Sequence, residues 1–218
     1  PCELMDLIGH DTNFAVTNSV YEANFYDKRY MPSLVQRELV DGGLLGRKTG
    51  RGFYRYPEGV PALPVALHEA PATAREITVH GDDAIADFLE GAATAALAPQ
   101  GWGPRRERGS GWTGLAVDGL HLVLTDGRPA YAWAAGHGEA DVAVFDRPLV
   151  LPAPPGAALA YAVADGASES CRTQARAWLA ALGFTPLNVA DTPGLVVART
   201  VAMLINEAAD AVRQGVCT

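Results

Sequence analysis

Two basic residues that lie among glycines could bind a phosphate group. Lys48 and Arg51 alternate with glycines in residues 46–54, and lysine and arginine are the usual partners of phosphate groups. Both are therefore candidate substrate-binding residues. The alternative is that 46–54 forms a compact turn, in which the glycines satisfy backbone geometry and the aromatic residues pack on helices. Such glycines commonly serve turns alone, so we favour the turn.

Asp6 and His10 are four residues apart, the spacing at which two side chains meet on one helix. They could form an acid and base pair. A structural hydrogen bond at a helix end is the better interpretation, because no nucleophile or second carboxylate accompanies them. A hydrolase site at Ser168 or Ser170 is set aside, since neither serine lies in a strand-turn-helix elbow. The other histidines are isolated in sequence, and we expect no functional role for them: His68, His80, His121 and His137.

The cysteines, Cys2, Cys171 and Cys217, are an odd number and are scattered along the chain without the Cys or His spacing of a zinc site. We expect free thiols and no metal. The net charge of −8 gives no basic surface for nucleic acid. No apolar run reaches the roughly 18 residues of a membrane span, and the first residues do not resemble a signal peptide. These features predict a cytoplasmic protein without nucleic acid or membrane partners.

Helical spacing of apolar residues extends from Leu4 to Leu45. Asp11-Thr12 and Pro32-Ser33 have the short polar side chains of helix starts. Gly42-Gly43 predicts the end of the second of these helices.

Four prolines in residues 57–74 predict a linker between two units. Beyond it, short β-rich segments alternate with Ala-rich helical stretches such as 83–97 and 168–182, which predicts a layered α/β domain. Residues 99–114 are dense in Gly and Pro and predict a long, mobile surface excursion. Helical period returns from Gly194 to Val212. The β-rich segments are Glu76 to His80, Leu115 to Val117, His121 to Thr125, Asp141 to Asp146, Ala158 to Ala164 and Thr185 to Val189.

Residues 1–27 and 32–56 resemble the helical C-terminal domain of 3-hydroxyacyl-CoA dehydrogenases. The resemblance lies in Pro-x-Glu-Leu-x-Asp from Pro1, Gly-x-Asp from Gly9, and Gly-Arg-Lys-Thr-Gly-x-Gly-Phe-Tyr from Gly46. In that family a Rossmann domain carrying NAD precedes the helical domain. The helical domain makes the dimer contacts and forms one wall of the acyl-CoA cleft. The resemblance thus implies a parent enzyme with NAD as cofactor, an acyl-CoA substrate and a homodimeric assembly.

Residues 158–216 resemble a second stretch of the same family, from the end of a Rossmann domain into the first long helix of the next helical domain. The chain therefore resembles a piece of the two-copy enzymes of bacterial phenylacetate and fatty-acid breakdown, without the first NAD-binding domain. The expected fold is mixed α and α/β. Its expected parts are a partial helical domain (1–56), the linker (57–74), a degenerate Rossmann-like α/β domain (75–191) and a long helix (192–218).

The second copy departs from the family at every position that carries its chemistry. The glycine-rich phosphate turn of a Rossmann domain is reduced to Gly81-Asp82-Asp83, whose carboxylates would repel phosphates. The family's catalytic His and Glu correspond to the neighbourhood of 148–155 and to Tyr161 or Ala162, where neither residue type occurs. Its Asn is replaced by Ala198 before Arg199. We expect no catalytic residue and no bound cofactor in this fragment, and no activity of the fragment alone.

The first long helix of the copy-one helical domain is missing from residues 1–56, while the chain ends on a helix of the matching type. We expect residues 194–214 to pack on 1–45 of the same chain or of a swapped neighbour. A non-catalytic interaction or assembly module is the alternative to a dimerisation and substrate-wall element of a dehydrogenase.

Overall fold

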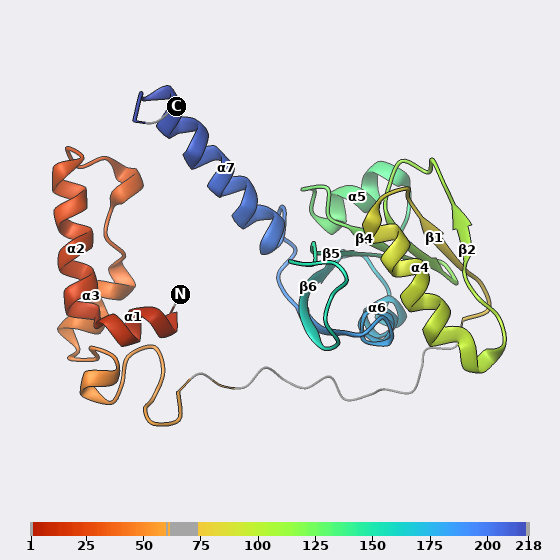
Figure 1. Cartoon of the computed structure of the whole chain (residues 1–218), viewed down its shortest axis with the longest axis horizontal. Coiled ribbons are helices and arrows are strands. Elements are labelled where there is room, and N and C mark those ends of the chain that lie inside the picture. The colour runs from red at the N-terminus through yellow and green to blue at the C-terminus, as the bar shows by residue number, and fades with distance from the viewer. Residues whose placement is uncertain (1, 60, 62–73, 217–218) are drawn as a thin grey trace. The chain divides into compact units, whose positions relative to one another are not determined.

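The computed structural model describes residues 2–59, 61 and 74–216 (Figure 1). Contacts divide the chain into residues 1–63, here called unit 1, and residues 64–218, here called unit 2. The division falls inside the proline-rich stretch 57–74. His68 and Cys217, together with most of that stretch, lie outside the described residues.

Unit 1 is helical, as the apolar spacing predicts. Its second helix begins at His10, so the prediction of a start at Asp11-Thr12 is wrong. The Asp11 carboxylate accepts hydrogen bonds from Lys48 and does not cap the helix. The third helix begins after Ser33 and ends at Gly42, as expected. The elements are α1 (Cys2–Ile8), α2 (His10–Ala23), η1 (Lys28–Tyr30), α3 (Leu34–Asp41) and η2 (Arg47–Thr49).

The interior of unit 1 is polar. Asp6, His10 and Gln36 are buried together with glycines, and no larger apolar side chain among its described residues is buried. Large apolar side chains lie instead on the surface of the helices and the segments between them. They are Leu4, Leu7, Ile8, Val16, Val20, Phe25, Tyr26, Met31, Leu34 and Val35, and Phe25 is 93% exposed. The described part of unit 1 therefore has apolar surface without an apolar core.

Unit 2 is built on one seven-stranded mixed sheet with the order β2-β1-β3-β4-β5-β6-β7. Each of the six predicted β-rich segments overlaps a strand, with bounds that differ by at most one residue at either end. Three strand pairs are parallel, and each is joined by a helix, as parallel pairing requires. The strands are β1 (Ile77–His80), β2 (Arg105–Glu107), β3 (Gly114–Val117), β4 (Leu120–Leu124), β5 (Val142–Phe145), β6 (Ala157–Val163) and β7 (Phe184–Asn188).

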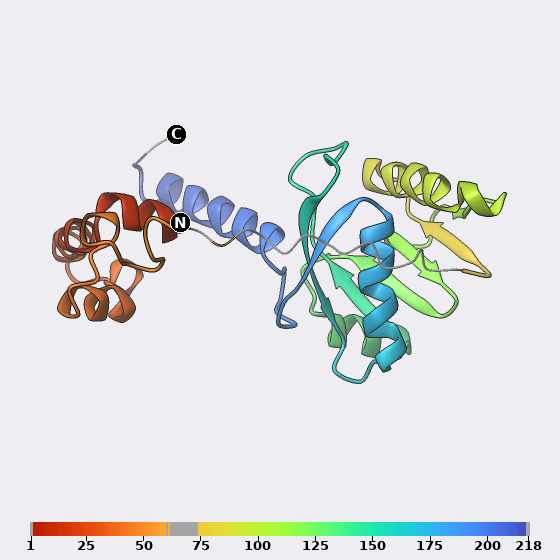
Figure 2. The same cartoon turned by 90° about the horizontal axis from the view of Figure 1, so that it is seen from below.

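The sheet is covered by helices on both faces, which is the layering that the alternating pattern predicts. The helices α4 (Ala84–Leu97) and α6 (Glu169–Ala181) pack on one face in a single apolar core. A second, smaller core lies under α5 (Ala130–His137), around the buried Trp133 (Figure 2). Both faces are therefore dry, which explains why β1 and β5 are buried along their whole length.

Two elements of unit 2 differ from expectation. Residues 99–114 are predicted as a surface excursion, but 105–107 form β2 and pair with β1. The reason is Arg106, whose guanidinium is fixed by Asp87 at 3.0 Å and Glu90 at 2.8 Å and whose side chain is 9% exposed. The sequence also gives no prediction for α5.

The last helix, α7 (Val197–Arg213), leaves the sheet as a separate element of unit 2. None of its residues is buried, and Val201, Met203, Leu204 and Ile205 are among the exposed apolar side chains. Packing of 194–214 on 1–45 stays a prediction. No helix in the described part of the chain is long and apolar enough to span a membrane.

Candidate functional site

A buried carboxylate joins the sheet of unit 2 to α7. Asp146 directly follows β5 and is fully buried. Its oxygens accept hydrogen bonds from the amides of Val196 at 2.9 Å, Val197 at 2.6 Å and Ala198 at 3.1 Å, and from its neighbour Arg147 at 2.8 Å. A carboxylate at a helix N-terminus satisfies free N–H groups and the positive end of the helix dipole. Asp146 is therefore committed to holding α7.

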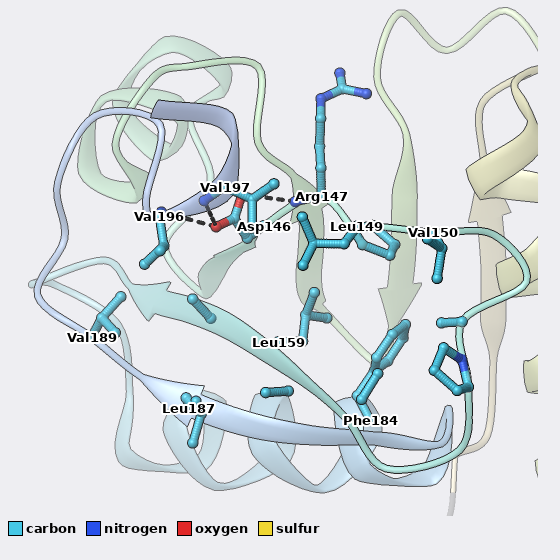
Figure 3. A pocket seen from close by; sticks show the side chains of 16 residues that line it. Asp146, Arg147, Leu149, Val150, Leu159, Phe184, Leu187, Val189, Val196 and Val197 are labelled. Atoms are coloured by element: carbon cyan, nitrogen blue, oxygen red, sulfur yellow. Dashed lines mark hydrogen bonds between the residues drawn. The ribbon is translucent and has the colours of Figure 1, made fainter. Parts of the chain in front are cut away.

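An apolar cavity of about 500 Å³ lies beside the contact between Asp146 and α7 (Figure 3). Its walls come from the segment after β5, from β6 and β7, and from the start of α7. Apart from Asp146 and Arg147, every lining side chain is apolar: Pro148, Leu149, Val150, Ala153, Pro154, Ala157, Ala158, Leu159, Ala160, Phe184, Leu187, Val189, Val196 and Val197. We call this cavity the apolar pocket. Its volume falls in the range of small-molecule sites.

A second hollow, of about 390 Å³, lies near the contact between Asp146 and α7 and shares Arg147 with the apolar pocket. It is more polar, and its lining includes Thr125, Asp126 and Arg199. Burial raises the pKa of Asp126, but hydrogen bonds from Arg128 outweigh burial and hold the pKa below its usual value. The guanidinium groups of Arg147 and Arg199 pair with no acidic side chain among the described residues. The hollow thus offers two free cations to an anion.

The turn after β1 is occupied by the chain's own carboxylates. Asp83 caps α4 by accepting from the Ala86 amide at 2.8 Å, and it also accepts from the Thr113 hydroxyl at 3.0 Å. Asp82 accepts from the Gly109 amide at 3.0 Å. These anions stand where a dinucleotide phosphate would need N–H donors, so the residues present do not fit that cofactor.

In unit 1, the segment 46–54 forms a compact turn. A side-chain carbon at Gly46 or Gly52 would collide with Asp6, so both positions need glycine. Lys48 Nζ donates to both oxygens of Asp11, at 2.5 and 2.6 Å. This hydrogen bond lowers the pKa of Asp11. Lys48 is therefore occupied, and substrate binding by Lys48 stays a prediction.

Arg51 is the more available of the two candidate substrate-binding residues. Its exposed guanidinium has no partner in the described part of the chain. Arg51 and Arg55 form an antiparallel β-bridge. Neighbouring residues make its hydrogen bonds: the Gly52 amide donates to the Tyr54 carbonyl, and the Tyr56 amide donates to the Gly50 carbonyl. In such a pair the two side chains stand close on one face. The two like charges favour an anion between them.

Asp6 holds the turn to the helices. Its carboxylate accepts from the amides of Phe53 at 2.9 Å and Tyr54 at 3.0 Å, from the Tyr56 hydroxyl at 2.9 Å, and from His10 Nε2 at 2.8 Å. Burial alone would raise the pKa of Asp6, but these hydrogen bonds together hold it below its usual value. The prediction of a structural hydrogen bond between Asp6 and His10 agrees with this geometry.

Three histidines that are isolated in sequence meet in unit 2. His80 stacks on Trp112 with ring centres 4.1 Å apart, and His137 stacks on Trp133 at 3.8 Å. His121 lies between the two tryptophans, 5.8 and 5.9 Å from their rings. Burial lowers the pKa of His80. The three rings pack with the two tryptophans at α5. The cluster cannot be recognised in the sequence because its members are far apart along the chain.

Metal ligation finds no support among the described residues, which contain no group of three or more His, Cys, Asp or Glu able to hold an ion. Cys2 and Cys171 are free thiols, as expected. Burial raises the pKa of Cys171 to about 11, which leaves this thiol unreactive.

Sequence reasoning missed the apolar pocket and Arg147. One signal was available in the sequence, the continuous apolar run from Pro148 to Pro155. In the structure this run lies outside any strand, and Leu149 is 82% exposed. Exposed apolar loops of this kind mark binding surfaces.

Two family descriptions match the chain. The 3-hydroxyacyl-CoA dehydrogenase C-terminal domain matches residues 1–56, and the 3-hydroxybutyryl-CoA dehydrogenase reduced Rossmann-fold domain matches residues 122–193. A 3-hydroxyadipyl-CoA dehydrogenase of Escherichia coli K12 is 35% identical over all 218 residues, which cover 38% of that protein. A probable 3-hydroxybutyryl-CoA dehydrogenase of Deinococcus radiodurans is 45% identical over 56 residues, which are 26% of this chain and 20% of the relative.

Among solved structures, a 3-hydroxybutyryl-CoA dehydrogenase from Escherichia coli K12 is similar over the whole chain. The TM-score is 0.71 at 33% identity, and the match covers 39% of that protein. The chain thus spans about two fifths of the length of the two Escherichia coli proteins.

Proposed function

The chain belongs to the 3-hydroxyacyl-CoA dehydrogenase family, and from this we propose that it is one part of an NAD-dependent enzyme that oxidises 3-hydroxyacyl-CoA to 3-oxoacyl-CoA. Within that enzyme, unit 1 supplies dimer contacts and part of the acyl-CoA wall, and the chain alone does not catalyse. We further propose that the whole enzyme is cytoplasmic and acts in phenylacetate or fatty-acid breakdown.

The observation that carries the dimer role is the apolar surface of unit 1. Large side chains such as Phe25, Met31 and Leu34 are more than half exposed, while the buried positions of this unit are polar or glycine. Soluble proteins rarely leave contiguous apolar surface of this kind in water. Covering it with a second copy would supply the apolar burial that unit 1 does not make internally.

The substrate-wall role rests on Arg51. Arg51 is exposed, is bridged through the backbone to Arg55, and its guanidinium is free to bind a phosphate of CoA. Lys48 supports the same wall indirectly, because its ion pair with Asp11 fixes the turn.

The absence of catalysis is supported by three residues of unit 2 that have a structural role or lack a polar side chain. Asp146 holds α7, Asp83 caps α4, and Ala198 offers no polar side chain. The assembly module remains the second candidate, and the apolar surface of unit 1 favours it equally. Substrate binding separates the two, because only the dehydrogenase role requires a CoA contact.

Titration calorimetry of acetoacetyl-CoA and of NAD into the full chain tests the substrate wall. We expect the CoA ester to bind, NAD to give no heat, and NADH-dependent reduction of the ester to be undetectable. Arg51→Ala should weaken the CoA ester about tenfold, the value of one charge-assisted contact. Arg176→Ala, an exposed arginine of α6, is the matched control. Reduction of the ester would contradict the inactivity, and failure of the ester to bind would leave only the assembly module.

Light scattering with Phe25→Asn tests the dimer contact. The residue is 93% exposed and has a positive φ of 53°, which asparagine tolerates, so the variant should fold normally. We expect the dimer dissociation constant to rise at least tenfold. Leu149→Asn removes another exposed apolar side chain, 82% exposed, from unit 2 and should leave the dissociation constant unchanged. A monomeric wild-type chain at micromolar concentration would refute the contact.

A further inference from the structure

We propose that residues 108–112 form a pH-sensitive strap beside the turn after β1, and that this strap opens when His80 takes up a proton. The strap, as we call this segment, lies between β2 and β3. Its last residue, Trp112, packs against the smaller core of unit 2. The proposal requires neither a cofactor nor the CoA contact of unit 1, so it stands or fails independently of the function proposed above.

The strap lies against the turn that follows β1. Residues of both segments, among them Asp82 and Trp112, line a hollow of about 200 Å³. Open α/β sheets bind their ligands at the carboxyl ends of the strands. In unit 2 the strap closes part of this edge with the chain's own residues.

The backbone of the strap can change its path at two glycines. Gly109 and Gly111 have φ of 73° and 81°, and no atom lies within 4 Å of the position that a side-chain carbon would take. The polar contacts of the strap to the turn are exposed. The Gly109 amide donates to Asp82 at 3.0 Å, and Arg108 pairs with the same carboxylate at 3.8 Å. Exposed ion pairs contribute little stability, so the contacts of Trp112 determine whether the strap is closed.

Trp112 is held by rings on the face of the sheet that α5 covers. It stacks on His80 with ring centres 4.1 Å apart and meets Trp133 edge to face at 5.5 Å. His121 is a further neighbour, 5.8 Å from Trp112. An imidazole is the side chain that changes charge near neutral pH. The stack of His80 on Trp112 therefore joins a titratable group to the strap.

The closed strap leaves little room for a charge on His80. The His80 side chain is 11% exposed, and its Nδ1 is buried without a hydrogen-bond partner in the described part of the chain. Glu107 on β2, 4.0 Å from Nδ1, favours the charged form, and His121 on β4 opposes it. His121 in turn faces Glu139 at 3.7 Å. Burial is the largest of these effects and holds the pKa of His80 below its usual 6.5.

The direction of the pH effect follows from that environment. Opening the strap exposes the His80 ring to water, where its pKa returns toward the ordinary value. The open form therefore binds a proton more readily than the closed form. Above pH 6.5 both forms are neutral and the strap stays closed, whereas acidification below 6.5 shifts the equilibrium toward the open form.

Hydrogen exchange of the full chain, measured by mass spectrometry at about pH 7.5 and about pH 5, tests the proposal. After correction for intrinsic rates, exchange of the strap amides should rise about fivefold at the lower pH, since each unit of pKa difference shifts a one-proton equilibrium by up to tenfold. The amides of α6 should not change. Both pH values lie above the range in which Asp6 of unit 1 takes up a proton.

Three substitutions assign the effect to His80. His80→Phe keeps a ring against Trp112 without a titratable nitrogen, so the strap should exchange slowly at both pH values. Trp112→Ala removes the stack and should exchange rapidly at both. His137→Phe is the matched control, because His137 is exposed and stacks on Trp133 instead, and this variant should respond to pH like the wild type.

Glu107→Gln gives a further readout that a purely structural role of the ring would not move. Loss of the carboxylate that favours the charged form should shift the midpoint of strap opening to lower pH. The proposal is overturned if strap exchange in the wild type does not rise, or rises equally in His80→Phe. It is also overturned if acid slows the exchange, because the charged ring would then hold Trp112 more tightly. An equal rise in α6 would show general loosening of unit 2 and would equally exclude the strap.

Discussion

Replacing Asp6 with alanine should unfold unit 1 and leave unit 2 intact. The change removes the common acceptor of the Phe53 and Tyr54 amides, the Tyr56 hydroxyl and His10. Leaving buried donors unpaired costs on the order of 3 kcal/mol or more in total. The described part of unit 1 has no apolar core to offset this loss.

Hydrogen exchange measured by mass spectrometry resolves the two units in the full chain. Peptides from residues 2–56 should lose protection in Asp6→Ala, while peptides from 75–191 keep theirs. All four tryptophans lie in unit 2, so the unfolding transition seen by tryptophan fluorescence should not move. Asp41→Ala, which breaks the exposed ion pair with Arg37, is the control and should cost at most about 1 kcal/mol. Unchanged protection in Asp6→Ala would show that the network is not needed.

The pH dependence of unit 1 follows from the same carboxylate. The pKa of Asp6 is lower in the folded chain than the value of about 3.9 expected in the unfolded chain. Its stabilisation is therefore complete above pH 4 and is lost as the pH falls through the folded pKa. After correction for intrinsic exchange rates, residues 2–56 should keep their protection above pH 4 and lose it progressively as the pH falls below 4. Asp6→Asn should show a weaker pH dependence than the wild type.

Replacing Asp146 with alanine should lower the free energy of unfolding of unit 2 by about 2 to 3 kcal/mol, the range for a buried cap that accepts from several N–H groups. The amides of Val196, Val197 and Ala198 lose their shared acceptor, so the first turn of α7 should fray. The pocket wall formed by that turn should loosen with it.

Urea unfolding followed by tryptophan fluorescence measures the effect of Asp146→Ala in unit 2 alone. Asp165→Ala removes an exposed carboxylate near the start of α6 and serves as control, with an expected change below about 0.5 kcal/mol. Exchange of the amides from 194 to 200 should rise in Asp146→Ala only. A midpoint equal to that of the control would mean that α7 does not depend on this cap.

Local sequence pattern predicted much of the fold because most of its elements are specified locally. The six β-rich segments and the helices near 83–97 and 168–182 all form, and Ser168 caps α6 through its own side chain. The helix α5 was missed because its cap is distant. The amides of Ala130 and Tyr131 are held by Asp191, about 60 residues further along the chain.

The same reason hides the candidate site. Asp146 precedes the amides that it caps by 50 residues, and the apolar pocket takes its walls from four separate segments. No spacing rule connects such residues before the sheet places them together. Arg106 similarly turns a Gly-rich stretch into β2 through partners on α4. By contrast, Lys48 and Arg51 stand out in sequence because the turn that holds them is short and contiguous.

Because α7 is held at its N-terminus by Asp146, a small rotation there produces a larger displacement at its C-terminus. The helix has 17 residues, so at 1.5 Å per residue it extends about 25 Å from its base, and a tilt of about 10° there moves its far end by roughly 4 Å. Val196 and Val197 lie at the N-terminus of α7 and also line the apolar pocket. A molecule that displaces either valine therefore turns a small local shift into a larger movement at the opposite end of α7.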